Sequence, residues 1–391
     1  MALFDFPNSP TLNQQVTMPD GTVRQWDGTK WKAGGATATG PYLQLSGGAM
    51  SGAMTVVGNA AAALQPVPLQ QLSSTLATTA PALNNVGRSY IHNGLMTIQQ
   101  RGQGPWTTSL AYTVDRWVLQ FLNGSMSVAV GTLTDANRAQ IGDEAATFYL
   151  SNTFTGGAAA GDYSFIVQFI EDVRRLAGKT VTVSFYASCA SGTPRVGVQI
   201  YQSFGSGGSP SPPVSVPGTS VTVSTTWQRY SVTVAVPSVS GKTFGTNSGT
   251  AFTGLRFWFS AGSNSAPDSG SVGVQSGTVA LWGIQLEIGS VATPLEKLDP
   301  RNDLANCQRF YTPGAILASF YSLAGAAVTS FVSFPVSMRA TPTMTQGAGN
   351  TISNINSFGL SASTFGVWIN GTGAATSTVT AYVNFIASAD L

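Results

Sequence analysis

Charge is almost absent from two long segments of this 391-residue chain, and this constrains its fold more than any other feature. No Asp, Glu, Lys or Arg occurs between Lys32 and Arg88, and Arg339 is the single charged residue between Arg309 and Asp390. Disordered chains combine low hydrophobicity with high net charge, whereas 43% of this chain is apolar and 9% is charged. An uncharged monomer would be poorly soluble. We therefore expect a homotrimer in which residues 35–87 and 310–391 supply the contacts between chains.

Composition also excludes several classes of function. The formal net charge is +2 without any basic stripe, so we expect no nucleic-acid binding. The N-terminus lacks the basic and apolar regions of a signal peptide. The uncharged stretch 315–336 is long enough to cross a bilayer, but its Ser and Thr residues and Pro335 oppose membrane insertion. Cys189 and Cys307 form no metal-binding pattern. They are either two buried thiols or the two halves of one disulfide.

Residues 1–34 predict a small β unit. Strand-like residues 22–26 and 30–32 flank Asp27-Gly28, which is a strong hairpin-turn signal. A hairpin of this size is marginally stable alone, so it must pack on sister chains or on a neighbouring protein. In residues 35–87, Leu69, Leu72 and Leu76 recur at helical spacing after Pro68. This segment is either a shaft with a short trimeric helix or a flexible linker.

The remaining chain is predicted to be mainly β. Many short strands with Gly- and Pro-rich turns indicate an antiparallel β-sandwich, or jelly roll, over residues 88–297. Residues 298–309 predict a short helical connector, and residues 310–391 predict a C-terminal β tip domain. The expected strands of the sandwich are residues 115–122, 164–170, 180–187, 195–202, 228–236, 255–260 and 279–287.

Four groups of motifs follow one another along the chain and resemble parts of bacteriophage tail-fibre proteins of the prophage type. Residues 6–10 with 26–31 resemble an N-terminal virion-attachment unit, and residues 42–56 are similar to a shaft repeat. Residues 113–117 with 282–287 and 294–296 resemble the bounds of a carbohydrate-binding-like jelly roll. Residues 307–311 and 334–342 are similar to fibre C-terminal segments.

This resemblance implies a structural protein of the phage tail, assembled in the host cytoplasm and carried in the virion. It implies that residues 1–34, with Trp26 and Trp31, attach the fibre to other tail or baseplate proteins. It also implies that the fibre binds a bacterial surface glycan, or another surface receptor such as a protein, during adsorption. A head fibre or virion decoration protein without a receptor role is the alternative.

Catalysis has little support in the sequence, and we expect no enzyme and no catalytic residue. The single histidine, His92, has no nucleophile motif around it and is expected to be a hydrogen-bonded structural residue. A polysaccharide depolymerase would need paired carboxylates. Asp115 or Glu287 could hold a structural calcium, or each could be a hydrogen-bonded carboxylate, since one or two acids cannot supply six oxygen ligands. The carboxylates available for a depolymerase are Asp162, Glu171, Asp172, Asp268, Glu287 and Glu296, with residues 171–175 expected to be a solvated loop.

Glycan binding needs only exposed aromatic rings beside neutral polar groups. In residues 255–259, strand alternation places Trp258 and Arg256 opposite the expected core face, where they are either exposed or buried by a neighbour. Trp106, Tyr201 and Phe204 are weaker candidates.

In residues 365–370, alternation places Trp368 and Asn370 opposite Phe365, Val367 and Ile369. Trp368 either stacks on sugars or packs in a trimer core. We expect residues 310–391 to be the distal tip and main host contact, with turns at 347–350 and 370–373.

Overall fold

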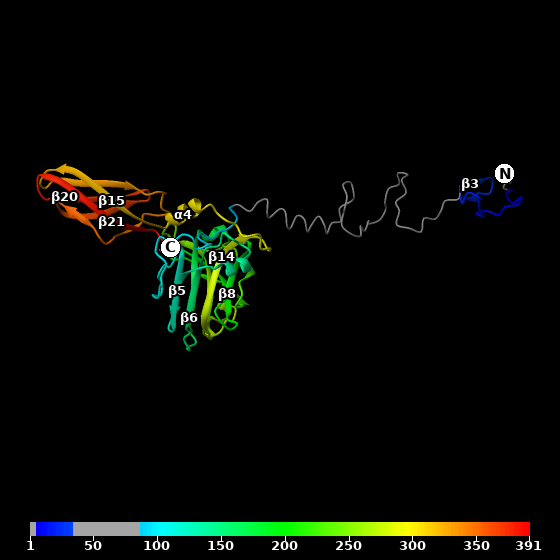
Figure 1. Cartoon of the computed structure of the whole chain (residues 1–391), viewed down its shortest axis with the longest axis horizontal. Helices are drawn as coiled ribbons and strands as arrows, with labels where there is room; N and C mark the ends of the chain where they lie inside the picture. Colours follow the sequence, from blue (N-terminus) through cyan, green and yellow to red (C-terminus); the bar gives the residue numbers. More distant parts are fainter. Residues whose placement is uncertain (1–4, 34–86) are drawn as a thin grey trace. The chain divides into compact units, whose positions relative to one another are not determined.

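The computed structural model describes residues 5–33 and 87–391 (Figure 1). The chain divides into two units, residues 1–73 and 74–391. The described part of the first unit is an antiparallel sheet of β1 (Gln15–Thr17), β2 (Val23–Trp26) and β3 (Trp31–Ala33). The Asp27 carboxylate accepts hydrogen bonds from the Thr29 and Lys30 amides and so closes the β2–β3 turn. The predicted shaft and its helix span residues 35–87, and all of this segment except Gly87 lies outside the described residues.

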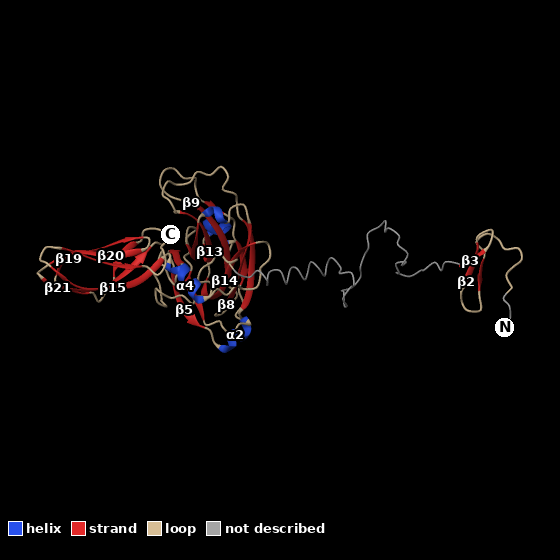
Figure 2. Ribbon diagram, turned by 90° about the horizontal axis from the view of Figure 1, so that it is seen from above, coloured by secondary structure: helices blue, strands red, loops and turns tan. Residues whose placement is uncertain are grey.

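Two antiparallel sheets form the larger sandwich of the second unit (Figure 2). One sheet has the order β10-β9-β13-β7-β4, with β11 also paired to β9, and the other has the order β12-β8-β14-β6-β5. The strands are β4 (Trp117–Leu122), β5 (Ser125–Thr132), β6 (Phe148–Thr155), β7 (Tyr163–Glu171), β8 (Thr180–Cys189), β9 (Arg195–Phe204), β10 (Val214–Ser215), β11 (Thr219–Thr222), β12 (Gln228–Ala235), β13 (Ala251–Ala261) and β14 (Ser276–Ile288).

Alternation of side chains explains the core of this sandwich. Leu255, Phe257 and Phe259 of β13 point inward and are fully buried, and Phe257 meets Phe185 of β8 edge-on at 5.0 Å between ring centroids. Each of the seven expected strands of this region overlaps a strand of the structure. The other elements are the helices α2 (Asp135–Ile141) and α3 (Ala266–Ser269) and the 3₁₀ turns η1 (Val173–Arg175) and η2 (Ser263–Ser265).

A second, smaller pair of sheets follows helix α4 (Pro300–Gln308). One sheet has the order β15-β21-β17, with β18 also on β21, and the other has the order β16-β20-β19. Buried Ile316, Ile369 and Val383 belong to the core between them. The strands are β15 (Tyr311–Ser322), β16 (Ala327–Ser333), β17 (Thr343–Gln346), β18 (Thr351–Ser353), β19 (Ile355–Ser363), β20 (Gly366–Gly373) and β21 (Ser377–Ser388).

The prediction of a mainly β chain with antiparallel sheets is therefore confirmed. Residues 315–336, long enough to cross a bilayer, form most of β15 and β16. None of the helices in the described ranges is long and apolar enough to cross a membrane. The predicted turn at 370–373 is wrong, because these residues continue strand β20 and pair with both β16 and β19.

Candidate functional site

Three aromatic side chains lie together on the outer face of the β16-β20-β19 sheet. Phe331 of β16 pairs directly with Trp368 of β20, and their ring centroids are 4.8 Å apart. Phe365 meets the Trp368 ring edge-on at 6.0 Å. The exposed fractions are 44% for Phe331 and 56% for Phe365, and Trp368 is half-buried between them. We call these three residues the aromatic platform.

Backbone geometry makes room for this platform. Gly366 begins β20 opposite Ser333. A Cβ atom at Gly366 would overlap the Phe331 ring, so only glycine lets that ring lie over β20 beside Trp368. The platform is therefore held by strand pairing and by a glycine.

Neutral polar groups border the platform. The exposed side chain of Asn370 donates from Nδ2 to the Ser361 hydroxyl at 2.7 Å, and Ser361 lies opposite Trp368 in β19. Thr329 lies opposite Asn370 in β16 and is exposed. An aromatic face of the protein can stack on the apolar face of a pyranose ring. Protein hydroxyl and amide groups can form the hydrogen bonds that the sugar hydroxyls otherwise form with water. This surface has the chemistry required for a saccharide.

The expected position of Trp368 and Asn370 matches the structure, but that of Phe365 is wrong. Val367 and Ile369 are buried while Trp368 and Asn370 face outward. Phe365 lies in the turn before β20, where strand alternation does not apply, and it joins Trp368 on the outer side. Sequence reasoning missed Phe331. The sequence shows the alternation within the strand of Phe331, but it does not show that this strand pairs with β20 and so places Phe331 beside Trp368.

Of the two alternatives for Trp258, exposure or burial, the structure supports burial. Trp258 is 3% exposed and lies in a second apolar cluster with Phe165 and Val272 on the outer face of β13. Its Nε1 donates to Gln199 Oε1 at 3.0 Å. Arg256 stacks on the Tyr201 ring, 4.1 Å from the centroid. The chain thus covers this face itself, and Trp258 and Arg256 offer no free surface for stacking.

A hollow on the outer face of the other large sheet is a second candidate surface. Its volume is about 160 Å³. Tyr149 of β6 and Trp227 meet edge-on at 5.6 Å beside it, and a Cβ at Gly131 would overlap the Tyr149 ring. Trp227 is nearly buried, so less aromatic surface is free here than on the platform. The hollow is lined by Asn137, Tyr149, Ser151, Ser188, Cys189, Ala190, Trp227, Thr278 and Ala280.

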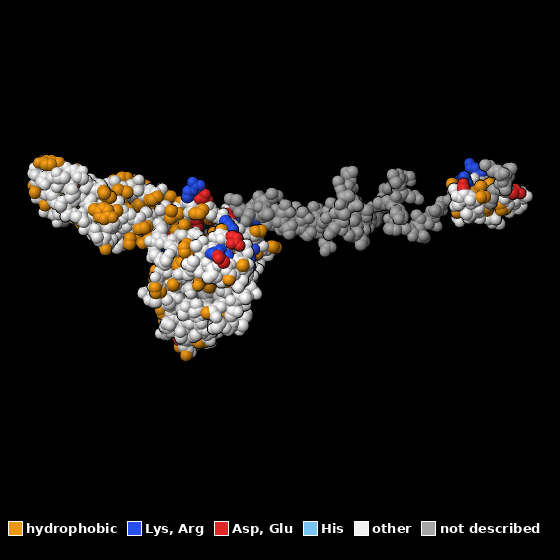
Figure 3. All heavy atoms as spheres, in the orientation of Figure 1, with side chains coloured by type: hydrophobic (Ala, Val, Ile, Leu, Met, Phe, Trp, Pro, Cys, Tyr) orange, Lys and Arg blue, Asp and Glu red, His pale blue; other side chains and the backbone are white. Residues whose placement is uncertain are grey.

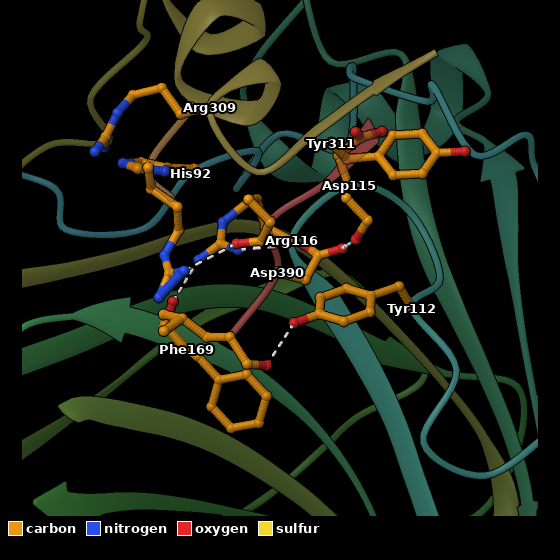
Figure 4. Close-up of polar contacts among 12 residues, drawn as sticks. His92, Tyr112, Asp115, Arg116, Phe169, Arg309, Tyr311 and Asp390 are labelled. Atoms are coloured by element: carbon orange, nitrogen blue, oxygen red, sulfur yellow. Dashed lines mark hydrogen bonds and ion pairs between the residues drawn. The ribbon is translucent and has the colours of Figure 1, made fainter. Parts of the chain in front are cut away.

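Buried charges gather where the C-terminal β domain meets the large sandwich (Figure 4). The Arg116 guanidinium is almost fully buried, stacks on Phe310 at 3.3 Å from the centroid and donates to the Phe169 carbonyl. Asp390 pairs with Arg101 at 2.5 Å and lies 3.9 Å from Arg116.

Glu171 pairs with Arg309 at 2.8 Å and with Arg339 at 3.4 Å. The expected solvated loop at 171–175 is therefore wrong at Glu171, which ends β7 inside this junction. The Asp172 side chain instead accepts from the Arg174 amide at the start of η1.

His92 is part of the same junction. Its backbone exchanges two hydrogen bonds with the Gln168 side chain, while ring Nδ1 is buried without a partner. Burial, followed by the cations Arg116, Arg309 and Arg175, lowers the pKa of His92 to about 3. The ring is thus neutral at neutral pH. The expected hydrogen bonding applies to the backbone of this histidine and not to ring Nδ1.

The candidate calcium ligands are occupied by hydrogen bonds. Asp115 accepts from the Gln100 amide and side chain, both at 2.7 Å, and burial raises its pKa. Glu287 accepts from the Thr293 amide and hydroxyl. Within residues 5–33 and 87–391, His, Cys, Asp and Glu form no group of three that could hold a metal ion. The arrangement favours the hydrogen-bonded alternative over calcium for both carboxylates.

Most of the other carboxylates considered for depolymerase chemistry also have structural partners. Asp162 accepts from Asn123 and from the Ala159 amide, and Glu296 accepts from three successive amides at Gly87, Arg88 and Ser89.

Cys189 and Cys307 are two buried free thiols and form no disulfide with each other.

The N-terminal unit has an aromatic group of its own. Trp26 and Trp31, the last residue of β2 and the first of β3, lie 5.6 Å apart between ring centroids, and Phe6 stacks on Trp31 at 5.1 Å. Trp26 and Trp31 are half-buried in the unit itself.

Comparison with known proteins adds a set of weak structural likenesses. No protein-family model matches the chain, and no curated protein is similar to it in sequence. A tailspike 4 domain of bacteriophage CBA120 matches at 15% identity and TM-score 0.29, over 51% of this chain and 21% of that one.

Two carbohydrate-binding modules also match. A family 4 module has 14% identity and TM-score 0.28 over 51% of this chain and 99% of its own. A family 11 module from Clostridium thermocellum, in complex with a mixed-linked tetrasaccharide, has 13% identity and TM-score 0.28 over 47% and 95%. Likenesses of this size establish neither a shared family nor a shared ligand.

Proposed function

We propose that this chain is a phage tail-fibre protein that binds a glycan of the bacterial surface through the aromatic platform. The proposal rests above all on one observation: Phe331, Phe365 and Trp368 are held side by side at the surface of a β domain, next to neutral hydrogen-bonding groups. Scattered exposed apolar residues need no explanation, whereas a contiguous group is typical of an interaction surface.

The alternative role for the same surface is contact within the virion, as in a head fibre or decoration protein. Two features support the glycan over this alternative. Gly366 positions the Phe331 ring, and the Asn370–Ser361 hydrogen bond orients an exposed amide beside Trp368. Both restrict side-chain freedom before binding, which lowers the entropic cost of recognition. Catalysis has no part in the proposal.

Self-association belongs to the opposite face of the same domain. Leu317 of β15 pairs with Tyr382 of β21, and the exposed fractions are 72% for Leu317, 68% for Tyr321 and 40% for Tyr382. We propose that this outer face of β15 and β21 packs against sister chains in a homotrimer, which leaves the platform free. Three platforms on one fibre would bind a cell with avidity even if each is weak. Residues 1–34, with Trp26 and Trp31, would attach the fibre to the virion.

The test uses fluorescently labelled full-length protein and a panel of bacterial strains. Wild-type protein is expected to label at least one strain, and Trp368→Ala is expected to lose that labelling by tenfold or more. Val274→Ser is the control, because it removes a 52% exposed apolar side chain from the large sandwich, outside both the platform and the β15 face. Circular dichroism and light scattering should show an unchanged fold and assembly for Trp368→Ala. Full labelling by Trp368→Ala would exclude the platform as the receptor contact, and no labelling of any strain would favour the decoration role.

A further inference from the structure

The surface of the C-terminal β domain carries no exposed charged side chain. Residues 310–391 contain two charged side chains, Arg339 and Asp390. Their exposed fractions are 7% and 10%, and both are engaged at the junction, Arg339 with Glu171 and Asp390 with Arg101. On the face drawn in Figure 3, charged side chains gather near α4 and the adjoining sandwich, while the region of β15–β21 shows only apolar and neutral groups.

This absence has a direct consequence for any ligand of the platform. A carboxylate, sulfate or phosphate pressed against Trp368 and Phe331 would lose hydration, and this domain presents no cation that could compensate. A neutral sugar loses only hydrogen bonds to water, and these can be replaced by the Asn370 amide and the Ser361 and Thr329 hydroxyls. The same surface therefore treats the two kinds of saccharide differently.

We infer that the aromatic platform selects neutral saccharides and discriminates against acidic ones. The inference rests on the proposed function, because it names the class of glycan that the same site takes. Its second consequence concerns salt. Without a charge on either partner, affinity is expected to be almost independent of ionic strength, whereas contacts between opposite charges weaken as salt screens them.

The test measures binding of full-length protein to pairs of immobilised hexasaccharides. Each pair has one backbone, in the gluco, galacto or manno configuration, and its two members differ only in oxidation of C6 from hydroxymethyl to carboxylate. We expect at least one neutral member to bind about tenfold or more tightly than its acidic partner. This affinity should change less than about twofold between 50 and 500 mM NaCl. It should disappear in Trp368→Ala and persist in Val274→Ser.

A second variant places a cation beside the platform. Thr329 is exposed and lies opposite Asn370, so Thr329→Lys puts an ammonium group at the polar border of the platform. We expect this variant to bind the acidic member of the pair, with an affinity that falls as NaCl rises. Thr329→Gln, which adds length without charge, should keep the preference for the neutral member.

The possible results separate the inference from the function on which it rests. If acidic members bind as tightly as neutral ones and this binding depends on Trp368, the inference is overturned but the proposed glycan binding is not. Binding of neutral members that Trp368→Ala does not reduce overturns both for this platform. If the protein binds no member of any pair, the inference is overturned. If Trp368→Ala also lowers the oligomeric state in light scattering, the platform is an interface between chains and the proposed function fails.

Discussion

Replacing Asp390 by Asn should destabilise the protein strongly, because it removes the carboxylate of a buried charge cluster. Asp390 follows β21 and lies 3.9 Å from Arg116 (Figure 4). It accepts from Arg101 at 2.5 Å and from the Ser388 hydroxyl at 2.8 Å. Asparagine keeps the size of the side chain but carries no charge. The variant therefore leaves two buried guanidinium groups without a facing anion at this point.

The magnitude follows from burial. The exposed side-chain fractions are 10% for Asp390, 12% for Arg101 and 2% for Arg116, so solvent screens these contacts little. Breaking a buried ion pair by removing one partner costs about 3–5 kcal/mol. We expect about 3 kcal/mol, the lower end, because the asparagine oxygen still accepts one hydrogen bond. With a urea slope of about 3 kcal/mol per M, the unfolding midpoint should fall by about 1 M.

Equilibrium urea unfolding followed by tryptophan fluorescence measures this shift. Asp135→Asn is the matched control, since it removes one carboxylate from a pair with Arg138 in which the Asp135 side chain is 96% exposed. We expect no measurable change from the control. If Asp390→Asn moves the midpoint no more than Asp135→Asn does, the junction does not stabilise the fold in the way argued here.

Three further predictions concern the second unit. The folded-state pKa of His92, about 3, lies below its ordinary value of about 6.5, so its contribution to stability is present above pH 6.5 and is lost as the pH falls. Between pH 6.5 and 4.5 the free energy of unfolding should fall by about 2–3 kcal/mol, and His92→Gln should remove this part of the pH dependence in urea titrations. In Gly197→Ala the new Cβ overlaps the Ser269 carbonyl, so the melting temperature should fall by about 4–8 °C. Gly277→Ala, whose Cβ meets only Phe154 at 3.8 Å, should melt close to wild type in the same calorimetric scan. Leu317→Lys should lower the molar mass measured by light scattering from that of a trimer toward that of a monomer. Val274→Lys, which replaces a 52% exposed residue of the large sandwich, should leave the mass unchanged. An unchanged mass for Leu317→Lys would exclude the β15 face as the trimer contact.

Two strands of the large sandwich show what the sequence could and could not predict. β13 alternates cleanly from Leu255 to Phe259, and it was predicted. β6 places Asn152 inward between Leu150 and Phe154, and that side chain is fully buried and donates to the Leu150 and Val279 carbonyls. An asparagine at such a position hides the strand pattern, because its hydrogen bonds are formed only in the folded chain.

The candidate site divides in the same way. The outward direction of Trp368 depends on its own strand alone, so alternation was sufficient. The platform also needs Phe331, placed by pairing with β16, and Phe365, placed by a turn. For Trp258 the strand direction was also right, but whether its outward face is open or covered depends on Phe165 and Val272, which lie outside its own strand. Local periodicity gives the face on which a residue lies and not what covers that face.

The distribution of charge gives the low charge content a structural meaning. The charged side chains of the C-terminal domain are used inside the protein, where Arg339 donates to the Gly249 and Ala389 carbonyls as well as pairing with Glu171. These contacts join the end of β21 and the loop before β13 to the junction, so the C-terminal domain is held against the large sandwich by buried polar contacts. A platform fixed in this way keeps its orientation to the rest of the second unit, which lowers the entropic cost of binding several ligands at once. The same residues that hold the domain in place thus leave its surface uncharged, and the selectivity for neutral ligands that we infer would be a consequence of how the fold is stabilised.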